Sequence, residues 1–159
     1  EKYDVWSSYR PEERGVLIAY TSIYGNTASA ALRLRDMLAR RGEKRVAVVD
    51  LARGDISRAV ADAFRYDALV LAASSSDGGV FPPRAAFLSR LKAKNWQKRT
   101  AAVIENGSWA PSAGKTMLAA LAEMKEIALP APTVTIRSAV SQETVEALNT
   151  LADALAARG

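Results

Sequence analysis

The 159-residue sequence contains no cysteine and no histidine. The lack of cysteine excludes disulfides, thiolate metal sites, iron–sulfur clusters and a cysteine nucleophile. The lack of histidine excludes Ser-His-Asp triads, histidine general bases and nearly every transition-metal site. A redox or group-transfer role would therefore depend on a bound organic cofactor, or on carboxylate and lysine chemistry.

Long apolar runs are also missing, and no segment approaches the ~20 residues that a membrane span needs. The sequence shows no signal-peptide pattern. Its 49% hydrophobic and 25% charged residues are typical of one soluble globular domain. We therefore predict a cytoplasmic protein without membrane contact. Because the first residue is Glu1 rather than Met, we expect the chain to be processed or excised from a longer one.

The net charge of +5 indicates an anionic ligand or an acidic partner as one interpretation. Basic and acidic side chains are interspersed, however, with no long run of like charge. No basic stretch carries the regularly placed aromatic residues that nucleic-acid readers use. We therefore predict that the chain does not bind nucleic acid.

Short apolar runs alternate with helical patterns from Gly15 onward, whereas residues 1–14 are polar and show no period. We interpret residues 1–14 as a connector and residues 15–159 as one domain. Short connections between parallel strands require crossover helices. The sequence thus predicts an α/β fold, a three-layer, doubly wound, five-stranded parallel sheet. The expected strands are 16–20, 45–50, 68–73, 100–104 and 134–137, and the expected helices are 27–41, 56–64, 82–93, 112–124 and 142–157.

Loops rich in Gly, Ser, Thr and Asn follow the first, third and fourth predicted strands. Ligands collect beyond the carboxyl ends of the strands in such sheets. The first loop, 21–27, leads directly into a helix, whose free N–H groups and partial positive charge favour a phosphate. It has neither a lysine nor three glycines, so a single phosphate ester fits best. A merely well-capped helix start is the alternative.

The second and third loops carry features that suit a flat ligand. Gly78 and Gly79 would let a planar ring lie against the backbone, or they form a flexible turn before Pro82. Trp109 would offer a stacking surface, or it folds back onto the core. Taken together, the loops indicate a site for a phosphorylated planar ring.

These loops resemble those of a known family. The sequence YTSIYGNT at 20–27 resembles the phosphate loop of flavodoxins, and more closely that of the flavodoxin-like domain of flavodiiron proteins. The second loop of that domain is similar to SSDGGVFP at 75–82, and its third to NGSW at 106–109. In flavodiiron proteins a connector follows the diiron domain, and Tyr3 and Trp6 are similar to residues of that connector. The sequence departs from the family pattern at Ser74, Ser76, Asp77 and 110–111.

The resemblance implies a flavodoxin-like fold that binds FMN and transfers one or two electrons, with no catalytic side chain and no metal in this chain. The implied phosphate contacts are Ser22, Ile23, Tyr24, Gly25, Asn26 and Thr27. The implied ring contacts are Ser75, Ser76, Asp77, Gly78, Gly79, the backbone of Asn106, Gly107 and Ser108, and a stacked Trp109.

The resemblance also implies partners. A diiron domain of the metallo-β-lactamase type would reduce oxygen or nitric oxide, and it would lie on the same parent chain or a neighbouring subunit because this chain has no histidine. An acidic donor such as rubredoxin would supply electrons, and two copies would pair as a homodimer. Two alternatives stay open: a stand-alone FMN-dependent NAD(P)H or quinone reductase, and a degenerate flavodoxin-like binding module that has lost its cofactor.

Overall fold

The computed structural model describes residues 11–21, 26–51, 55–74, 82–106, 113–131, 133–136 and 142–158. Strands and helices alternate along them, as the sequence pattern predicts. The elements are β1 (Glu13–Tyr20), α2 (Asn26–Arg40), β2 (Val46–Asp50), α3 (Ile56–Arg65), β3 (Tyr66–Ser74), α4 (Pro82–Ala93), β4 (Arg99–Asn106), α5 (Ala113–Ala122), β5 (Ile127–Ala128), β6 (Val134–Ile136) and α6 (Gln142–Ala156).

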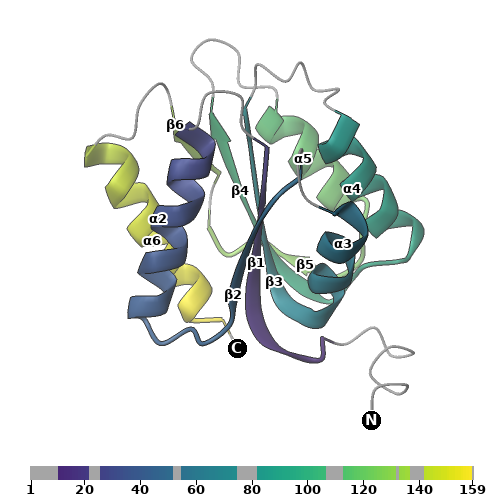
Figure 1. The fold of residues 1–159 in the computed structure, drawn as a ribbon, viewed down its shortest axis with the longest axis horizontal. Coiled ribbons are helices and arrows are strands. Elements are labelled where there is room, and N and C mark those ends of the chain that lie inside the picture. Colours follow the sequence, from purple (N-terminus) through teal and green to yellow (C-terminus); the bar gives the residue numbers. More distant parts are fainter. Residues whose placement is uncertain are drawn as a thin grey trace.

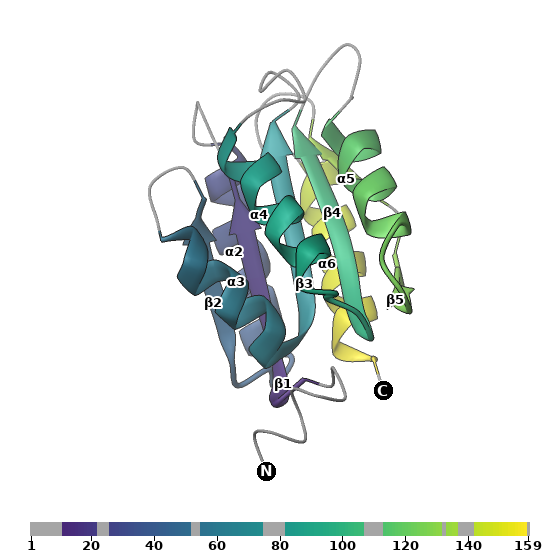
Figure 2. The same ribbon diagram turned by 90° about the vertical axis from the view of Figure 1, so that its right-hand side faces the viewer.

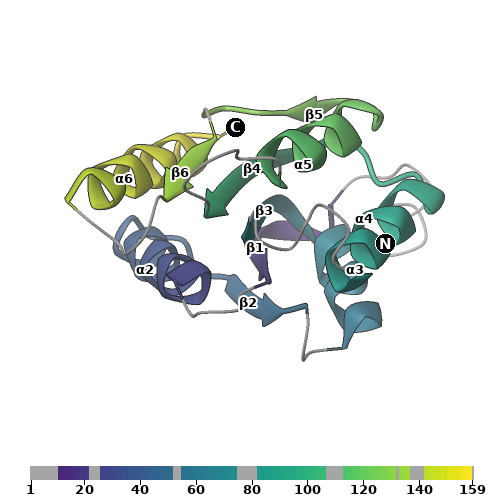
Figure 3. The same ribbon diagram turned by 90° about the horizontal axis from the view of Figure 1, so that it is seen from above.

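All strand pairs in the sheet are parallel. The order is β2-β1-β3-β4, and both β5 and β6 pair with β4 at the edge. Helices α2 and α6 cover one face, and α3, α4 and α5 cover the other (Figure 1; Figure 3, from above). This confirms the predicted three-layer α/β class, and the strand order is the one that flavodoxin-like sheets have.

The edge strand beside β4 is divided in two. β5 pairs with the start of β4, at Arg99 and Thr100, whereas β6 pairs with its end, from Ile104 to Asn106. Pro130 lies between the two pieces. A proline has no N–H to donate to the ladder, so pairing is interrupted there. The predicted strand at 134–137 corresponds to β6, and β5 is an additional strand.

The central strands are buried on both faces, which explains their unbroken apolar sequence. Side chains alternate between the two faces along a strand. Leu17, Leu69 and Val103 therefore pack under α3, α4 and α5, whereas Ile18 and Val70 pack under α2 and α6. None of the described helices is long and apolar enough to cross a membrane.

Trp96 completes the core beneath α3 and α4. Its side chain is almost fully buried, and its Nε1 donates a hydrogen bond of 2.8 Å to the carbonyl of Ala63. A buried indole N–H needs such a partner, because an unsatisfied donor would cost about 1–3 kcal/mol. The bond thus attaches the turn after α4 to the last turn of α3.

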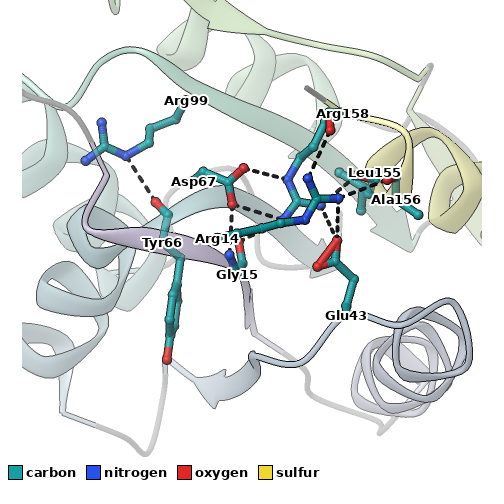
Figure 4. A network of polar contacts seen from close by, with 9 residues as sticks. All are labelled: Arg14, Gly15, Glu43, Tyr66, Asp67, Arg99, Leu155, Ala156 and Arg158. Carbon is teal, nitrogen blue, oxygen red and sulfur yellow. Dashed lines mark hydrogen bonds and ion pairs between the residues drawn. The ribbon is translucent and has the colours of Figure 1, made fainter.

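Buried charges link the edge at which the strands begin to the end of α6 (Figure 4). Arg158 Nη1 lies 2.6 Å from Glu43 Oε1, and Arg158 Nε lies 2.8 Å from Asp67 Oδ2. The backbone N–H of Gly15 donates to Asp67 Oδ1 at 2.9 Å. Arg14 joins the group through Nη2, which lies 3.0 Å from Glu43 Oε1. We call these five residues the amino-edge network.

Charges in this region shift one another's pKa values. Burial raises the pKa of Asp67, but hydrogen bonds from Arg158 and Gly15 and the charges of Arg158 and Arg14 outweigh it, so that the net pKa is lowered. Burial lowers the pKa of Arg158, yet Asp67 and Glu43 reverse this and raise it overall. Nearby, burial lowers the pKa of Arg99 to about 10, which leaves its guanidinium charged at neutral pH.

Candidate cofactor site

The strands that precede the three candidate loops end at one edge of the sheet. In the register, Tyr20 of β1 lies beside Ala72 of β3, and Ser74 of β3 lies beside Asn106 of β4. Asn106 in turn lies beside Ile136 of β6. Figure 2 shows β1, β3 and β4 running in one direction to a common edge. The described strand ends therefore place the starting points of the loops together, as the sequence predicts.

Most predicted cofactor contacts lie outside the described residues and stay predictions. They are Ser22, Ile23, Tyr24, Gly25, Ser75, Ser76, Asp77, Gly78, Gly79, Gly107, Ser108 and Trp109. The structure describes Thr27 in full and the backbone of Asn26 and Asn106. Asn26 opens α2, and Asn106 is the last residue of β4.

Thr27 lies in the first turn of α2 and is fully buried. Its hydroxyl oxygen, Oγ1, has no hydrogen-bond partner within the described part of the chain. A buried hydroxyl left unsatisfied costs about 1–3 kcal/mol. Such a group at the start of a helix, next to backbone N–H groups that have no intrahelical acceptor, is suited to donate to an anion.

The first turn of α2 has no acidic residue that would compete with an anion. A carboxylate there would satisfy the helix N–H groups and the positive end of the helix dipole itself. No carboxylate of the first turn of α2 competes with a ligand for these groups. The chemistry of this helix start therefore fits a phosphate group, and the phosphate contacts themselves stay a prediction.

Backbone hydrogen bonds fix the point at which the first loop leaves the sheet. The N–H of Thr21 donates to the carbonyl of Ala72 at 3.0 Å, and the N–H of Leu51 donates to the carbonyl of Tyr20 at 2.8 Å. The end of β1 is thus held from both neighbouring strands. The loop begins from a rigid support, which a binding site on a sheet edge requires.

The structure adds one charged residue that the sequence analysis missed. Glu105, next to last in β4, is buried, with 7% of its surface exposed. Its Oε1 accepts a hydrogen bond of 3.1 Å from Oγ1 of Thr135 in β6. An acidic residue ending an apolar strand was the only signal in the sequence, and it does not distinguish a buried carboxylate from an exposed one.

A cavity of about 360 Å³ lies elsewhere, between the divided edge strand and α6. Thr133, Thr135, Ala147 and Thr150 are among its lining residues, and none of the predicted cofactor contacts lines it. Within the described ranges, no group of three acidic side chains is placed to hold a metal ion. The carboxyl edge of the sheet thus remains the candidate site.

Comparison with known proteins finds similarity in structure rather than in sequence. No family model and no curated protein sequence matches the chain. Rubredoxin oxygen:oxidoreductase from Desulfovibrio gigas matches with a TM-score of 0.88 and 20% identity, over 98% of this chain and 38% of that one. The flavodiiron protein from Giardia intestinalis matches with a TM-score of 0.79 and 21% identity, over 97% of this chain and 39% of that one.

Flavodoxin 1 from Bacillus cereus matches with a TM-score of 0.76 and 18% identity, over 89% of this chain and 96% of the flavodoxin. The chain therefore corresponds to nearly a whole flavodoxin, but spans about two fifths of the flavodiiron structures. The structural neighbours are thus those that the loop motifs predicted, and the fold they share with this chain is the flavodoxin-like one.

Proposed function

Because the chain has a flavodoxin-like fold, we propose that it binds FMN at the carboxyl edge of its sheet and serves as an electron-transfer domain. The observation that carries the proposal is Thr27, whose buried hydroxyl lacks a partner in the described chain at the helix start where a phosphate is expected. The resemblance of the first loop to flavodoxin phosphate loops supports the same cofactor.

In this proposal, Thr27 Oγ1 and backbone N–H groups at the start of α2 would donate hydrogen bonds to the phosphate. Ser22, Tyr24 and Asn26 complete the phosphate contacts. Trp109 would stack on the ring, the loop from Ser75 to Gly79 would edge it, and the backbone from Asn106 to Ser108 would meet its polar rim. When bound, FMN supplies reversible uptake of one or two electrons.

The chain's own residues then bind and orient the cofactor rather than act as acids or bases. This role agrees with a sequence that has no histidine and no cysteine. The sheet edge gives a rigid support, since backbone bonds from β2 and β3 hold the end of β1.

The electron acceptor that we propose is a diiron domain of the metallo-β-lactamase type, on the same parent chain or on a second subunit of a homodimer. Support comes from the match to about two fifths of the flavodiiron structures. The FMN-loaded chain alone should then reduce neither oxygen nor nitric oxide in steady turnover. Sustained turnover with NAD(P)H by the isolated chain would instead favour the stand-alone reductase.

An acidic electron donor, such as a rubredoxin, would suit the net charge of +5. On α2, Arg33, Arg35 and Arg40 are exposed. Opposite charges speed association, and salt screens them. Reduction of the FMN-loaded chain by such a donor should slow as ionic strength rises. Rates that do not change with salt would exclude electrostatic docking.

The decisive experiment compares FMN with riboflavin, which lacks only the phosphate. The purified chain should bind FMN at micromolar concentration or below, seen as a changed visible spectrum and quenched flavin fluorescence. Riboflavin should bind at least about tenfold more weakly, because it loses hydrogen bonds to a charged group. No spectral change with FMN would leave the degenerate binding module as the better reading. Equal binding of both compounds would refute the phosphate site.

A further inference from the structure

A buried carboxylate lies at the same edge as the proposed cofactor. Glu105 precedes Asn106, the last residue of β4, by one position and is 7% exposed. In the register, Glu105 pairs with Ala73 of β3 and with Thr135 of β6. Its Oε1 accepts a hydrogen bond of 3.1 Å from Thr135 Oγ1. The group is therefore held in place from the neighbouring strand.

Strand alternation determines the side of the sheet on which this carboxylate lies. Val103 packs in the core beneath α3, α4 and α5. Glu105 is two positions further along β4 and so projects from the same face. Between the buried Arg99 at the start of β4 and Glu105, that face carries Ala101 and Val103, which belong to the core. A carboxylate takes the place that the pattern assigns to an apolar side chain.

The position is costly for a group with only a structural role. A buried carboxylate loses its hydration and needs compensating hydrogen bonds. Joining β6 to β4 does not require it, because backbone pairing from Ile104 to Asn106 already joins the two strands. The carboxylate instead lies directly before the residues whose backbone we assign to the polar rim of the ring.

We propose that the Glu105 carboxylate lowers the reduction potential of the flavin bound at this edge, with Thr135 orienting it; this inference rests on the proposed function. The physical cause is charge. Two-electron reduction of the flavin takes two electrons from the donor and one or two protons from water. Uptake of a single proton leaves a negative charge on the ring. A fixed negative charge nearby destabilises this reduced form relative to the oxidised one.

The size of the effect can be expressed as a binding ratio. Removal of the charge should strengthen binding of reduced FMN relative to oxidised FMN, by about tenfold for two unit charges about 12 Å apart at an effective dielectric constant near 20. For a two-electron couple, a tenfold ratio corresponds to a rise of about 30 mV in midpoint potential. Loss of a packing contact alone would weaken the binding of oxidised and reduced FMN equally and leave this ratio unchanged.

The test is a dithionite titration of FMN-loaded protein, followed by absorbance against a reference dye. We expect Glu105→Gln to raise the midpoint potential of the bound FMN by about 30 mV. Glu126→Gln is the control, because it removes a charge of the same sign from an exposed residue. Glu126 precedes Ile127, which pairs with Arg99 at the opposite end of β4. The control should leave the midpoint potential unchanged. An unchanged midpoint in Glu105→Gln, or equal shifts in both variants, would overturn the inference.

A second variant keeps the inference testable if Glu105→Gln does not fold. Thr135→Val retains the branched shape of the side chain but removes the hydroxyl that donates to Glu105. The less compensated carboxylate should then shift the midpoint down, opposite to Glu105→Gln. A rise or no shift would contradict the inference. Failure of the wild-type chain to take up FMN would overturn this inference together with the proposed function, whereas normal uptake with unaltered potentials overturns this inference alone.

Discussion

Arg158 and Glu43 face each other inside the protein, with Nη1 2.6 Å from Oε1 and 4% of each side chain exposed. The two residues are 115 positions apart in the sequence. Arg14 adds hydrogen bonds of 3.0 and 2.9 Å to the carbonyls of Arg158 and Ala156. The end of α6 is thereby attached to the start of β1 and to the segment between α2 and β2 (Figure 4).

Glu43→Gln should lower the free energy of unfolding by about 3 kcal/mol, because it leaves the buried Arg158 with only part of its charge compensation. Urea denaturation measures the change. Glu123→Gln is the matched control, since it removes an ion pair with Lys92 in which both side chains are more than half exposed. The control should cost less than about 1 kcal/mol. Equal losses in the two variants would show that burial of the pair is not what matters.

The lowered pKa of Asp67 predicts how the free energy of unfolding depends on pH. Its pKa is lowered in the folded protein, since Arg158 and Gly15 more than offset the effect of burial. A carboxyl with a lowered pKa binds protons more weakly when folded than when unfolded. Its contribution is therefore present above the unfolded value of about 4 and is lost as pH falls through the folded value.

Thermal unfolding between about pH 5 and pH 2 should show this loss in the wild-type chain. Asp67→Asn should be less stable at neutral pH and should lose less of its remaining stability across this range. The amide oxygen can still accept the hydrogen bond from Gly15, but the NH2 group that replaces Oδ2 cannot accept from Arg158 Nε, so the variant loses the charge and that hydrogen bond. Parallel pH profiles for the two proteins would contradict the assignment.

Thr27→Val separates a role in folding from a role in binding. The substitution keeps the shape of the side chain but removes the hydroxyl that has no partner in the described structure. Without FMN, the variant should be as stable as the wild type or more stable, because a buried unsatisfied group is removed. Its affinity for FMN should fall about tenfold or more. Calorimetry and fluorescence titration measure the two effects, and unchanged affinity would remove Thr27 from the phosphate site.

Gly15→Ala should be destabilising by about 1–3 kcal/mol. A Cβ at this position would lie 2.5 Å from Cδ1 of Tyr66 and 3.0 Å from the carbonyl oxygen of Arg45. Gly15 also donates its N–H to Asp67, so a shift of the backbone would disturb the amino-edge network. An unchanged unfolding midpoint would show that the Tyr66 ring moves aside freely.

The sequence was informative wherever one local pattern determines an element. The apolar runs of β1, β3 and β4 are continuous because both faces of these strands are covered, and the helices between them show clear periodicity. β5 was not predicted, since its two residues pair with β4 only through tertiary context. Strand order was likewise beyond reach of periodicity, because pairing partners are set by packing.

The candidate site divides in the same way. The pattern of a helix that begins after β1 predicted Thr27 as a phosphate contact. Only the structure reveals that its hydroxyl is buried and lacks a partner in the described chain. The burial of Glu105 was not predicted because its surroundings are tertiary, as the hydrogen bond from Thr135, thirty positions away, illustrates. Neither Arg158 nor Glu43 drew attention, since surface charges and buried ones look alike in a sequence.

The position of Arg14 beside Arg158 has a practical consequence. Arg14 lies at the start of β1 and donates to the carbonyl of Arg158, so both lie at the opposite end of the sheet from Tyr20, Ser74 and Asn106. An affinity tag or surface linker joined near either residue would anchor the molecule with its loop-bearing rim pointing outward. On an electrode, that orientation would let a soluble electron carrier reach the rim. It would disfavour direct electron transfer between the electrode surface and a cofactor bound at the rim.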